Sequence, residues 1–305
     1  MKVLVTGGAG YIGAELCAAL AHDERVGELV VYDLLDRGHT GIFTGPKLGR
    51  AKVRFVQGDV LDSRRLLQEL AGCDMVYHLA AKVTTPFAEA GHSQFEQVNH
   101  WGTAEVVYAI EEAAPKARVA YLSSASVYGQ GAGSALSGTK PSPRSAYGHS
   151  KLRGEAHMQR LGDGQQVLVL RSGNVYGHGR SMRFDAVINR FVFQAHFQDR
   201  ITVRGSGEQK RPFIHVDSVV GALAAWLNPQ ELAGTYDLVE QSWSVLQLVE
   251  ALRELYPGME ILFVDQHLDL LGMEVARDPR LAGLQPVRPA NLVADLRAIA
   301  GKFAW

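Results

Sequence analysis

The stretch TGGAGYIG, residues 6–13, decides the fold of this chain. It follows an apolar run, KVLVT (2–6), opens a helical pattern, and spaces Gly8, Gly10 and Gly13 as Gly-x-Gly-x-x-Gly. Glycines with this spacing permit a tight turn and a close approach of the backbone, so that amides at the helix N-terminus can hold a pyrophosphate. The stretch therefore predicts a strand, turn and helix that bind a dinucleotide, although the pattern alone also fits an ordinary strand-to-helix turn.

A carboxylate at the end of the next apolar run strengthens this prediction. Asp33 ends ELVVYD (28–33), twenty residues after Gly13, where an acidic side chain can accept hydrogen bonds from both ribose hydroxyls. A carboxylate in this place would repel a 2′-phosphate, so it favours NAD over NADP, with Arg37 nearby as the opposing signal. We therefore expect NAD as the cofactor.

Short apolar runs rich in β-branched residues recur and alternate with helical patterns. They are KVLVT (2–6), ELVVYD (28–33), KVRFVQ (52–57), DMVYHLA (74–80), ARVAYLS (117–123) and QVLVLR (166–171). Such alternation predicts an α/β fold, a doubly wound parallel sheet of the Rossmann type with helices on both faces. We expect an NAD-binding domain over 1–171, rejoined by part of 208–228, and a smaller, partly interleaved α/β substrate domain over 172–305.

The composition is that of an ordinary globular protein. The 305 residues are 47% hydrophobic and 21% charged, and a net charge of -1 gives no electrostatic reason to expect nucleic acid or an anionic membrane as partner. The longest apolar run, VVGALAAWL (219–227), is too short to span a bilayer. Cys17 and Cys73 lack metal-type spacing, so we expect two buried thiols, no bound metal and a cytoplasmic location.

A phenol and an ammonium stand four residues apart in SAYGHSK, residues 145–151. Tyr147 and Lys151 would lie on one face of a helix, where they form either a reactive pair or mere neighbours. Oxidation of a secondary alcohol needs a base for the hydroxyl proton, and a phenol serves only if its pKa falls from about 10 to about 7. That shift takes about 4 kcal/mol, which a cation about 4 Å away supplies where the effective dielectric constant is near 20. We therefore expect Lys151 to lower the pKa of Tyr147.

The surrounding motifs follow the order of a known family. They are TGGAGYIG, Asp33, GDV (58–60), HLAA (78–81), VNHWGT (98–103), SSASVYG (123–129), YGHSK (147–151), RSGNVYG (171–177) and RPFIHVDSVV (211–220). Over about its first 220 residues the chain thus resembles the extended short-chain dehydrogenase/reductase family, in the NAD-dependent nucleotide-sugar epimerase and dehydratase branch that includes the UDP-glucose/galactose 4-epimerases. The resemblance weakens after residue 240.

The resemblance implies roles for particular residues. The catalytic ones would be Ser124, Tyr147 and Lys151. The cofactor would contact Gly7, Gly10, Tyr11, Ile12, Gly13, Asp33, Asp59, Val60, Leu79, Ala80, Ala81, Asn99, Tyr147 and Lys151. The substrate would contact Lys82, Thr84, Ser124, Ser126, Asn174 and Arg211. Arg211 resembles the family's diphosphate-binding arginine, with an ordinary surface arginine as the alternative, whereas His78 is better explained as a packed strand-end histidine than as a catalyst.

The two residues after Ser124 bear on the reaction. The family's 4,6-dehydratases carry Asp and Glu there as an extra acid and base, and its sugar decarboxylases carry Glu at the second position; here they are Ala125 and Ser126. We therefore favour an NAD-dependent epimerase of a nucleotide sugar, with a UDP-sugar as the expected substrate, that acts through a transient 4-keto intermediate.

Two alternatives stay open. One is a nucleotide-sugar 4-keto reductase or dehydrogenase of the same family, and the other, of a different class, is a non-catalytic NAD-binding regulator. The intact Ser124, Tyr147 and Lys151 argue against a regulator. By analogy with the family, we expect a homodimer formed by helices equivalent to 93–114 and 145–161.

Overall fold

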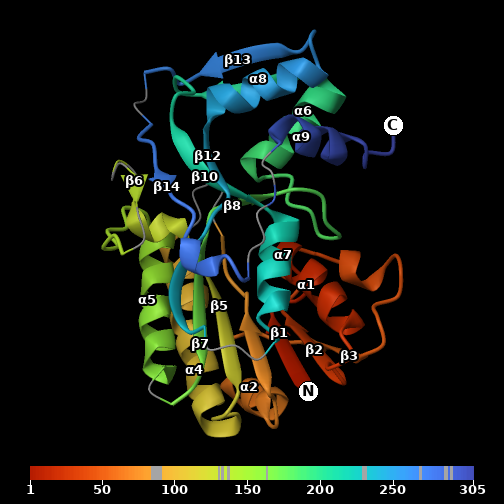
Figure 1. Cartoon of the computed structure of the whole chain (residues 1–305), viewed down its shortest axis with the longest axis vertical. Helices are drawn as coiled ribbons and strands as arrows, with labels where there is room; N and C mark the ends of the chain where they lie inside the picture. The colour runs from red at the N-terminus through yellow and green to blue at the C-terminus, as the bar shows by residue number, and fades with distance from the viewer. Residues whose placement is uncertain are drawn as a thin grey trace.

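A parallel sheet with helices on both faces forms the larger part of the fold (Figure 1). The computed structural model describes residues 1–83, 91–129, 131, 134–135, 138–162, 164–228, 232–267, 270–284, 288 and 291–305. In this part of the chain, seven strands form one sheet in the order β11-β7-β5-β4-β1-β2-β3, and every neighbouring pair is parallel. The predicted doubly wound parallel sheet is confirmed.

The six apolar runs all form strands of this sheet, close to the predicted bounds. The strands are β1 (Lys2–Thr6), β2 (Glu28–Asp33), β3 (Lys52–Gln57), β4 (Met75–His78), β5 (Arg118–Ser124) and β7 (Val167–Ser172). The seventh strand, β11 (Gly234–Leu238), pairs with β7 at the edge of the sheet. The chain thus returns to the sheet beyond the predicted 208–228 segment, and the domain limits stay a prediction.

Helices cover the two faces of the sheet, as Figure 1 shows. One face holds α1 (Tyr11–His22) and α7 (Val216–Ala225). The other holds α2 (Ser63–Leu70), α4 (Gly102–Ala113) and α5 (Ala146–Leu161). Successive strand residues point to opposite faces, so Val5 packs in the core beneath α1 and α7, whereas Leu4 packs in the core beneath α2, α4 and α5. Two apolar cores therefore enclose the sheet.

The helix predicted over 93–114 contains an irregular turn. It consists of α3 (His92–Phe95), a π-helical stretch (Glu96–Trp101) and α4, which follow one another without a break. A π-helical turn adds a residue to the helix and redirects the side chains next to it, and such turns are frequent at functional sites. The side chain of Asn99 comes from this turn.

The remaining elements build a smaller lobe, at the top of Figure 1. Strands β8 (Asn174–Tyr176), β10 (Lys210–His215) and β12 (Gln241–Ser244) form a three-stranded sheet. Strand pairs are formed by β9 (Arg200–Arg204) with β13 (Glu260–Val264), and by β6 (Ser134–Ala135) with β14 (Glu274–Val275). The helices are α6 (Val187–Gln198), α8 (Val245–Leu255) and α9 (Leu292–Ala300), which share a third apolar core.

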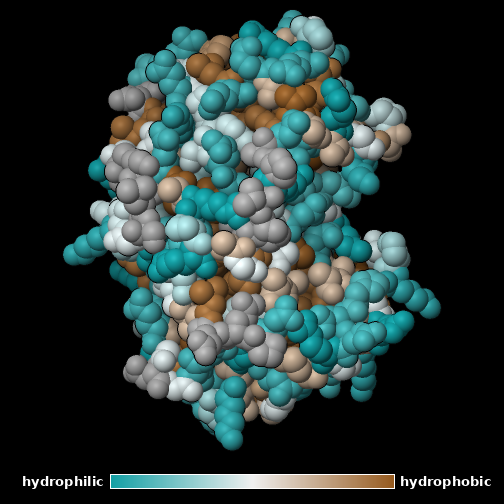
Figure 2. All heavy atoms as spheres, viewed as in Figure 1, coloured by the Kyte–Doolittle hydropathy of each residue, from teal (hydrophilic) through white to brown (hydrophobic). Residues whose placement is uncertain are grey.

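The distribution of hydrophilic residues on the surface and the state of the two cysteines are those expected from the composition of a globular protein. On the face shown in Figure 2, hydrophilic residues cover most of the surface and hydrophobic residues form patches among them. Within the described ranges, the search for a helix long and apolar enough to cross a membrane finds none. Cys17 and Cys73 are buried thiols that are not joined to each other.

Truncation of Leu223 tests how strongly α7 holds the sheet together. The side chain is fully buried in the core that α7 shares with α1. We expect Leu223→Ala to lower the free energy of unfolding by about 3 kcal/mol, because it removes buried methyl groups and leaves a cavity. Chemical denaturation measures the loss. The control is Leu262→Ala, at a side chain 48% exposed on β13, which should stay within about 0.5 kcal/mol of the parent protein; equal losses would contradict this account.

Candidate active site

A large cavity opens where the carboxyl ends of the parallel strands meet the smaller lobe. Its volume is about 940 Å³. Open α/β sheets bind ligands at this edge, because the loops that follow the strands converge there. The predicted site residues that line it are Gly7, Gly10, Tyr11, Ile12, Gly13, Asp33, Asp59, Val60, Leu79, Ala80, Ala81, Lys82, Ser124, Ser126, Tyr147, Lys151, Asn174 and Arg211. One cavity therefore brings together nearly all of them.

The glycine turn between β1 and α1 leaves no room for side chains. A Cβ atom added to Gly13 would lie 2.1 Å from the carbonyl oxygen of Gly7, and one added to Gly7 would lie 2.6 Å from the backbone nitrogen of Ala80. The start of α1 therefore packs directly on the end of β1, with its first amides at the cavity wall. This close packing is what a pyrophosphate on a helix N-terminus requires, so the turn fits a dinucleotide.

Two carboxylates hold the turns at the side of the cavity where β2 and β3 end, which we call the adenosine side because the resemblance predicts adenosine there. Asp33, at the end of β2, accepts hydrogen bonds from the backbone amides of Ala9 at 3.0 Å and Leu35 at 2.8 Å. Asp59 accepts one from the amide of Leu61 at 3.0 Å. Both also line the cavity, so Asp33 can hold the glycine turn, and Asp59 the loop after β3, while each carboxylate remains near a ligand in the cavity.

The guanidinium of Arg37 is already occupied. It donates a hydrogen bond to the carbonyl oxygen of Val83 at 3.0 Å and lies 3.7 Å from the carboxylate of Asp185. The nearby Asp36 pairs with Lys82 at 2.6 Å. With these contacts Arg37 is poorly placed to neutralise a 2′-phosphate, which agrees with NAD rather than NADP.

Asn99 supports the site from behind the cavity wall. Its amide oxygen accepts a hydrogen bond from the backbone amide of Lys82 at 2.8 Å, and its amide nitrogen donates to the carbonyl oxygen of Lys82 at 2.9 Å and to Ser150 at 3.0 Å. The side chain is fully buried, so these contacts join the loop after β4 to α5. Its direct contact with a cofactor stays a prediction, as does that of Lys82 with substrate. Thr84 lies outside the described residues.

Helix α5 approaches the turn after β5 through a glycine. A Cβ atom on Gly148 would lie 2.5 Å from the carbonyl oxygen of Ser126, so only glycine permits this contact. Ser145 caps the helix by accepting a hydrogen bond from the amide of Gly148 at 3.0 Å. Tyr147 lies between Ser145 and Gly148 at the start of α5, close enough to Ser124 for this hydroxyl to act on its pKa. Ser124 and Tyr147, which come from different elements, thus meet at one wall of the cavity. Sequence reasoning missed the role of Gly148, although the glycine stands inside the quoted SAYGHSK.

Burial acts against the charged forms of Tyr147 and Lys151. It raises the pKa of Tyr147 above its ordinary value, with the hydrogen bond to Ser124 and the charge of Arg183 acting in the opposite direction. It lowers the pKa of Lys151 to about 7, opposed by the negative charge of Glu155. The expectation that Lys151 lowers the pKa of Tyr147 is therefore wrong for the residues alone. The physical reason is desolvation, which outweighs the opposing effects of Ser124 and Arg183 on Tyr147.

The wall next to Tyr147 carries no extra carboxylate among the described residues. Ala125 and Ser126 begin a short 3-10 turn over 125–128, and the Ser124 hydroxyl caps it by accepting a hydrogen bond from the amide of Ser126 at 3.1 Å. The acidic residues that line the cavity within the described ranges are Asp33, Asp36, Asp59 and Asp185. Asp33 ends β2, and Asp36 and Asp59 lie in the loops after β2 and β3. Asp185 forms a two-pronged contact with Arg183 at 2.9 and 3.0 Å.

The opposite side of the cavity is basic. Arg211 donates hydrogen bonds to the carbonyl oxygens of Lys210 at 2.9 Å and Leu271 at 2.7 Å, and forms no ion pair within the described residues. Asn174 donates to the carbonyl oxygen of Pro212 at 3.0 Å. Arg190 of α6 also lines this side, where burial and the charge of Arg204 lower its pKa. Arg183 and Arg190 could not be predicted from any motif, because only the fold brings α6 and the preceding segment to the cavity.

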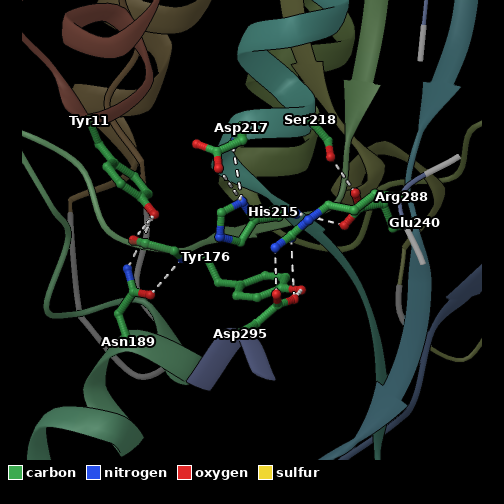
Figure 3. Close-up of polar contacts among 10 residues, drawn as sticks. Tyr11, Tyr176, Asn189, His215, Asp217, Ser218, Glu240, Arg288 and Asp295 are labelled. Atoms are coloured by element: carbon green, nitrogen blue, oxygen red, sulfur yellow. Dashed lines mark hydrogen bonds and ion pairs between the residues drawn. The ribbon is translucent and has the colours of Figure 1, made fainter. Parts of the chain in front are cut away.

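A polar network ties the two lobes together beside the cavity (Figure 3). Tyr11 of α1 donates a hydrogen bond to the carbonyl oxygen of Gly177, whose amide donates to Asn189 of α6 at 3.0 Å. Tyr176 donates to Asp295 of α9 at 2.7 Å. The amide of His215 and the hydroxyl of Ser218 both donate to Glu240. The glycine turn and the smaller lobe are thereby fixed relative to each other.

The chain is similar to known proteins over most of its length. Residues 3–238 match the family described as the NAD dependent epimerase/dehydratase family. The chain is 30% identical over 260 residues to the dTDP-D-glucose 4,6-dehydratase of Mus musculus, covering 83% of this chain and 72% of that protein. It is also 30% identical over 242 residues to a Bacillus subtilis (strain 168) protein described as an uncharacterized UDP-glucose epimerase, covering 77% and 75%. The UDP-glucuronic acid 4-epimerase from Bacillus cereus, solved with UDP-glucuronic acid and NAD, has a TM-score of 0.83 at 26% identity, covering 99% of this chain and 98% of that one.

A methyl group added at the glycine turn tests the cofactor site. We expect Gly13→Ala to reduce retained NAD by about tenfold or more, because its Cβ would clash with the Gly7 carbonyl and displace the start of α1. The NAD released from the denatured protein after gel filtration measures the effect. The control is Gly221→Ala in α7, where an added Cβ meets nothing within 4 Å and helix propensity improves. Full NAD retention by Gly13→Ala would contradict the assignment.

Proposed function

The chain belongs to the NAD-dependent epimerase/dehydratase family, and we propose that it is an epimerase of a nucleotide sugar, with a UDP-sugar as substrate and Tyr147 as base. The observation that carries this proposal is the meeting of Ser124, Tyr147 and Lys151 at one wall of the cavity, with no carboxylate after Ser124. The family membership makes the protein an NAD-dependent enzyme. The finer assignment rests on the residues at this wall.

Each of the three residues has a separate task. Bound NAD supplies the acceptor and later the donor of the hydride. Tyr147 removes the proton of the C4 hydroxyl and returns it when the 4-keto sugar is reduced on its other face. Ser124 hydrogen-bonds the reacting oxygen and Tyr147 in turn. Burial raises the pKa of Tyr147, and the positive charge of Arg183 acts against this rise. In the proposed mechanism, Lys151 stands beside Tyr147 on α5 as the cation that would favour the phenolate once cofactor and substrate are bound.

The absence of acid catalysts among the described residues at this wall argues against elimination reactions. A dehydratase needs a proton donor and a second base beside the sugar, in addition to the tyrosine. The described carboxylates of the cavity lie on the adenosine side or, for Asp185, in contact with Arg183 and Arg37. This supports epimerisation, which requires oxidation and reduction at a single carbon, even though one relative is named a 4,6-dehydratase.

The basic side of the cavity supports a nucleotide sugar as substrate. Arg211 and Arg190 supply guanidinium groups, and Asn174 supplies an amide, on the wall opposite the glycine turn. Guanidinium groups suit a diphosphate because their planar donors match two oxygens at once. The similar Bacillus cereus epimerase is described in complex with UDP-glucuronic acid. We therefore extend the proposal to a UDP-sugar whose diphosphate lies near Arg211.

A turnover assay without added cofactor tests the proposal. We expect the purified protein to convert at least one member of a UDP-hexose or UDP-uronate panel to its C4 epimer, detected by chromatography and NMR. Tyr147→Phe should lose at least about 100-fold in turnover while it still retains NAD, because it lacks the transferable proton. Tyr256→Phe, at a tyrosine that follows α8 and does not line the cavity, is the matched control and should keep full activity.

The same assay separates the alternatives. Consumption of NADPH with a 4-keto sugar, and no epimer, would establish a reductase and overturn the epimerase. Tight NAD binding without turnover of any alcohol, and with Tyr147→Phe indistinguishable from the parent, would indicate a regulator.

Two aromatic side chains support a homodimer through α4 and α5. Trp101 is 54% exposed and Tyr108 is 41% exposed, and their spacing of seven residues places both on one face of the helix. Aromatic residues are enriched at protein interfaces. We expect the parent protein to run as a dimer in gel filtration with light scattering, and Trp101→Glu to shift it to the monomer mass. Leu262→Glu, at a residue 48% exposed on β13, should leave the dimer intact; a monomeric parent would contradict the proposal.

A further inference from the structure

The ammonium of Lys151 lies against an aromatic ring. Its Nζ atom is 4.2 Å from the centroid of the Tyr121 ring, and only 2% of the Lys151 side chain is exposed. Tyr121 belongs to β5, three residues before Ser124, whereas Lys151 comes from α5. The negative face of an aromatic ring attracts a cation, and this attraction is strongest where water is excluded.

Glu155, the acidic residue nearest to Lys151 in the sequence, compensates the positive charge of Lys151 only in part. Glu155 lies one helical turn further along α5 and favours the charged lysine, but its carboxylate accepts hydrogen bonds from Arg171 at 2.7 and 3.0 Å and from Ser123 at 2.6 Å. The guanidinium of Arg171 thus neutralises much of that charge. Lys151 forms no ion pair within the described residues, whereas its ammonium lies in direct cation–π contact with the Tyr121 ring.

The ring itself is held in a rigid setting. His78 of β4 stacks on Tyr121 with centroids 5.4 Å apart, and its two ring nitrogens meet Thr6 at 2.6 Å and Thr103 at 3.0 Å. Burial, with the charge of Lys151, lowers the pKa of His78 to about 3, so the imidazole is neutral and does not repel the ammonium.

The hydroxyl end of Tyr121 is enclosed as well. It lies beneath Gly154 of α5, where an added Cβ would be 2.4 Å from the phenol oxygen. Thr103 lies close enough to influence the pKa of this phenol, but no hydrogen bond of good geometry joins the hydroxyl to a described residue. The ring, rather than the hydroxyl, is therefore the part of Tyr121 that is set against Lys151.

We propose that Tyr121 is a positioning residue of the proton-transfer pair, whose ring holds the Lys151 side chain in place and stabilises its ammonium. The inference rests on the proposed function, because it assigns Tyr121 a role through Lys151 and Tyr147. It gives a partner to a buried ammonium that forms no ion pair within the described residues. The charged or titratable groups that act on Lys151 in this account are Tyr121 on β5, His78 on β4, and Tyr147 and Glu155 on α5.

A series of rings of similar shape, in which the negative charge of the ring face decreases step by step, tests the proposal. Phenylalanine and a series of increasingly fluorinated phenylalanines are placed at position 121 of the full-length, NAD-loaded protein. The pKa of Lys151 is followed by NMR of lysine labelled with ¹³C at Cε, with the signal assigned by its loss in Lys151→Arg. We expect Tyr121→Phe to leave the titration almost unchanged. The most fluorinated ring should lower the pKa of Lys151 by about one unit, a tenfold loss of ammonium at a given pH.

A matched series and a second readout complete the experiment. The same analogues at Tyr77, a fully buried ring of β4 that packs in the core beneath α1 and α7, control for general effects on the fold and should not move the Lys151 titration. In turnover, the alkaline limb of the pH profile should move to lower pH with fluorination at position 121, because Lys151 loses its proton earlier.

The outcomes for Tyr121 and for the enzyme's function are separable. A Lys151 pKa that is indifferent to fluorination, or that falls equally in the Tyr77 series, overturns the role of Tyr121 whatever the enzyme catalyses. The titration needs no substrate, so a shifted pKa upholds the contact between ring and ammonium even if no epimer is formed. In that case the proposed epimerase function fails together with the role of Tyr121 in proton transfer, whereas the stabilisation of the Lys151 ammonium by the ring still holds.

Discussion

The close approach of two helices to the ends of two strands is the constraint on which the site depends. Helix α1 packs on the turn after β1 because Gly13 lets its backbone contact Gly7, and α5 packs on the turn after β5 because Gly148 lets it contact Ser126. The first contact exposes amides for a pyrophosphate, and the second brings Tyr147 to Ser124. Side chains at either glycine would push the helices outward and separate the cofactor from the catalytic wall.

Charge is divided across the cavity rather than over the whole molecule. The net charge is only -1, yet the lining residues on the side of β2 and β3 include Asp33, Asp36 and Asp59, whereas Arg190 and Arg211 face them from the smaller lobe. An acidic side suits the hydroxyls of a ribose, and a basic side suits phosphates. In the function that we propose, this division would orient the two anionic ligands in one cavity without a strongly charged surface.

The sequence predicts the structure well where a single local pattern, such as a run of apolar residues, determines a strand. Strands buried on both faces read as continuous apolar runs, so their bounds could be predicted almost to the residue. Strand β11 was missed because its five residues, GTYDL, include a glycine, a threonine and an aspartate and resemble no such run. Arg183 and Arg190 were missed for another reason. Arg183 lies in the irregular segment before α6, and Arg190 lies in α6 itself. Neither belongs to a recognisable motif, and only the packing of α6 against the cavity brings them to its wall.

Predictions of pKa from spacing failed because spacing carries no information on desolvation. Tyr147 and Lys151 are four residues apart, which places them together on α5 but does not say how much water reaches them. In the folded protein, burial favours the neutral phenol and the neutral amine alike. A charged pair can then form only if neighbouring groups return part of the lost hydration energy, and Ser124 and Arg183 do so for Tyr147. Because the charges of such a pair depend on each other, its titration belongs to the pair rather than to either residue. The pH dependence of the reaction is consequently set by everything that packs around α5 and β5, and not by Tyr147 and Lys151 alone.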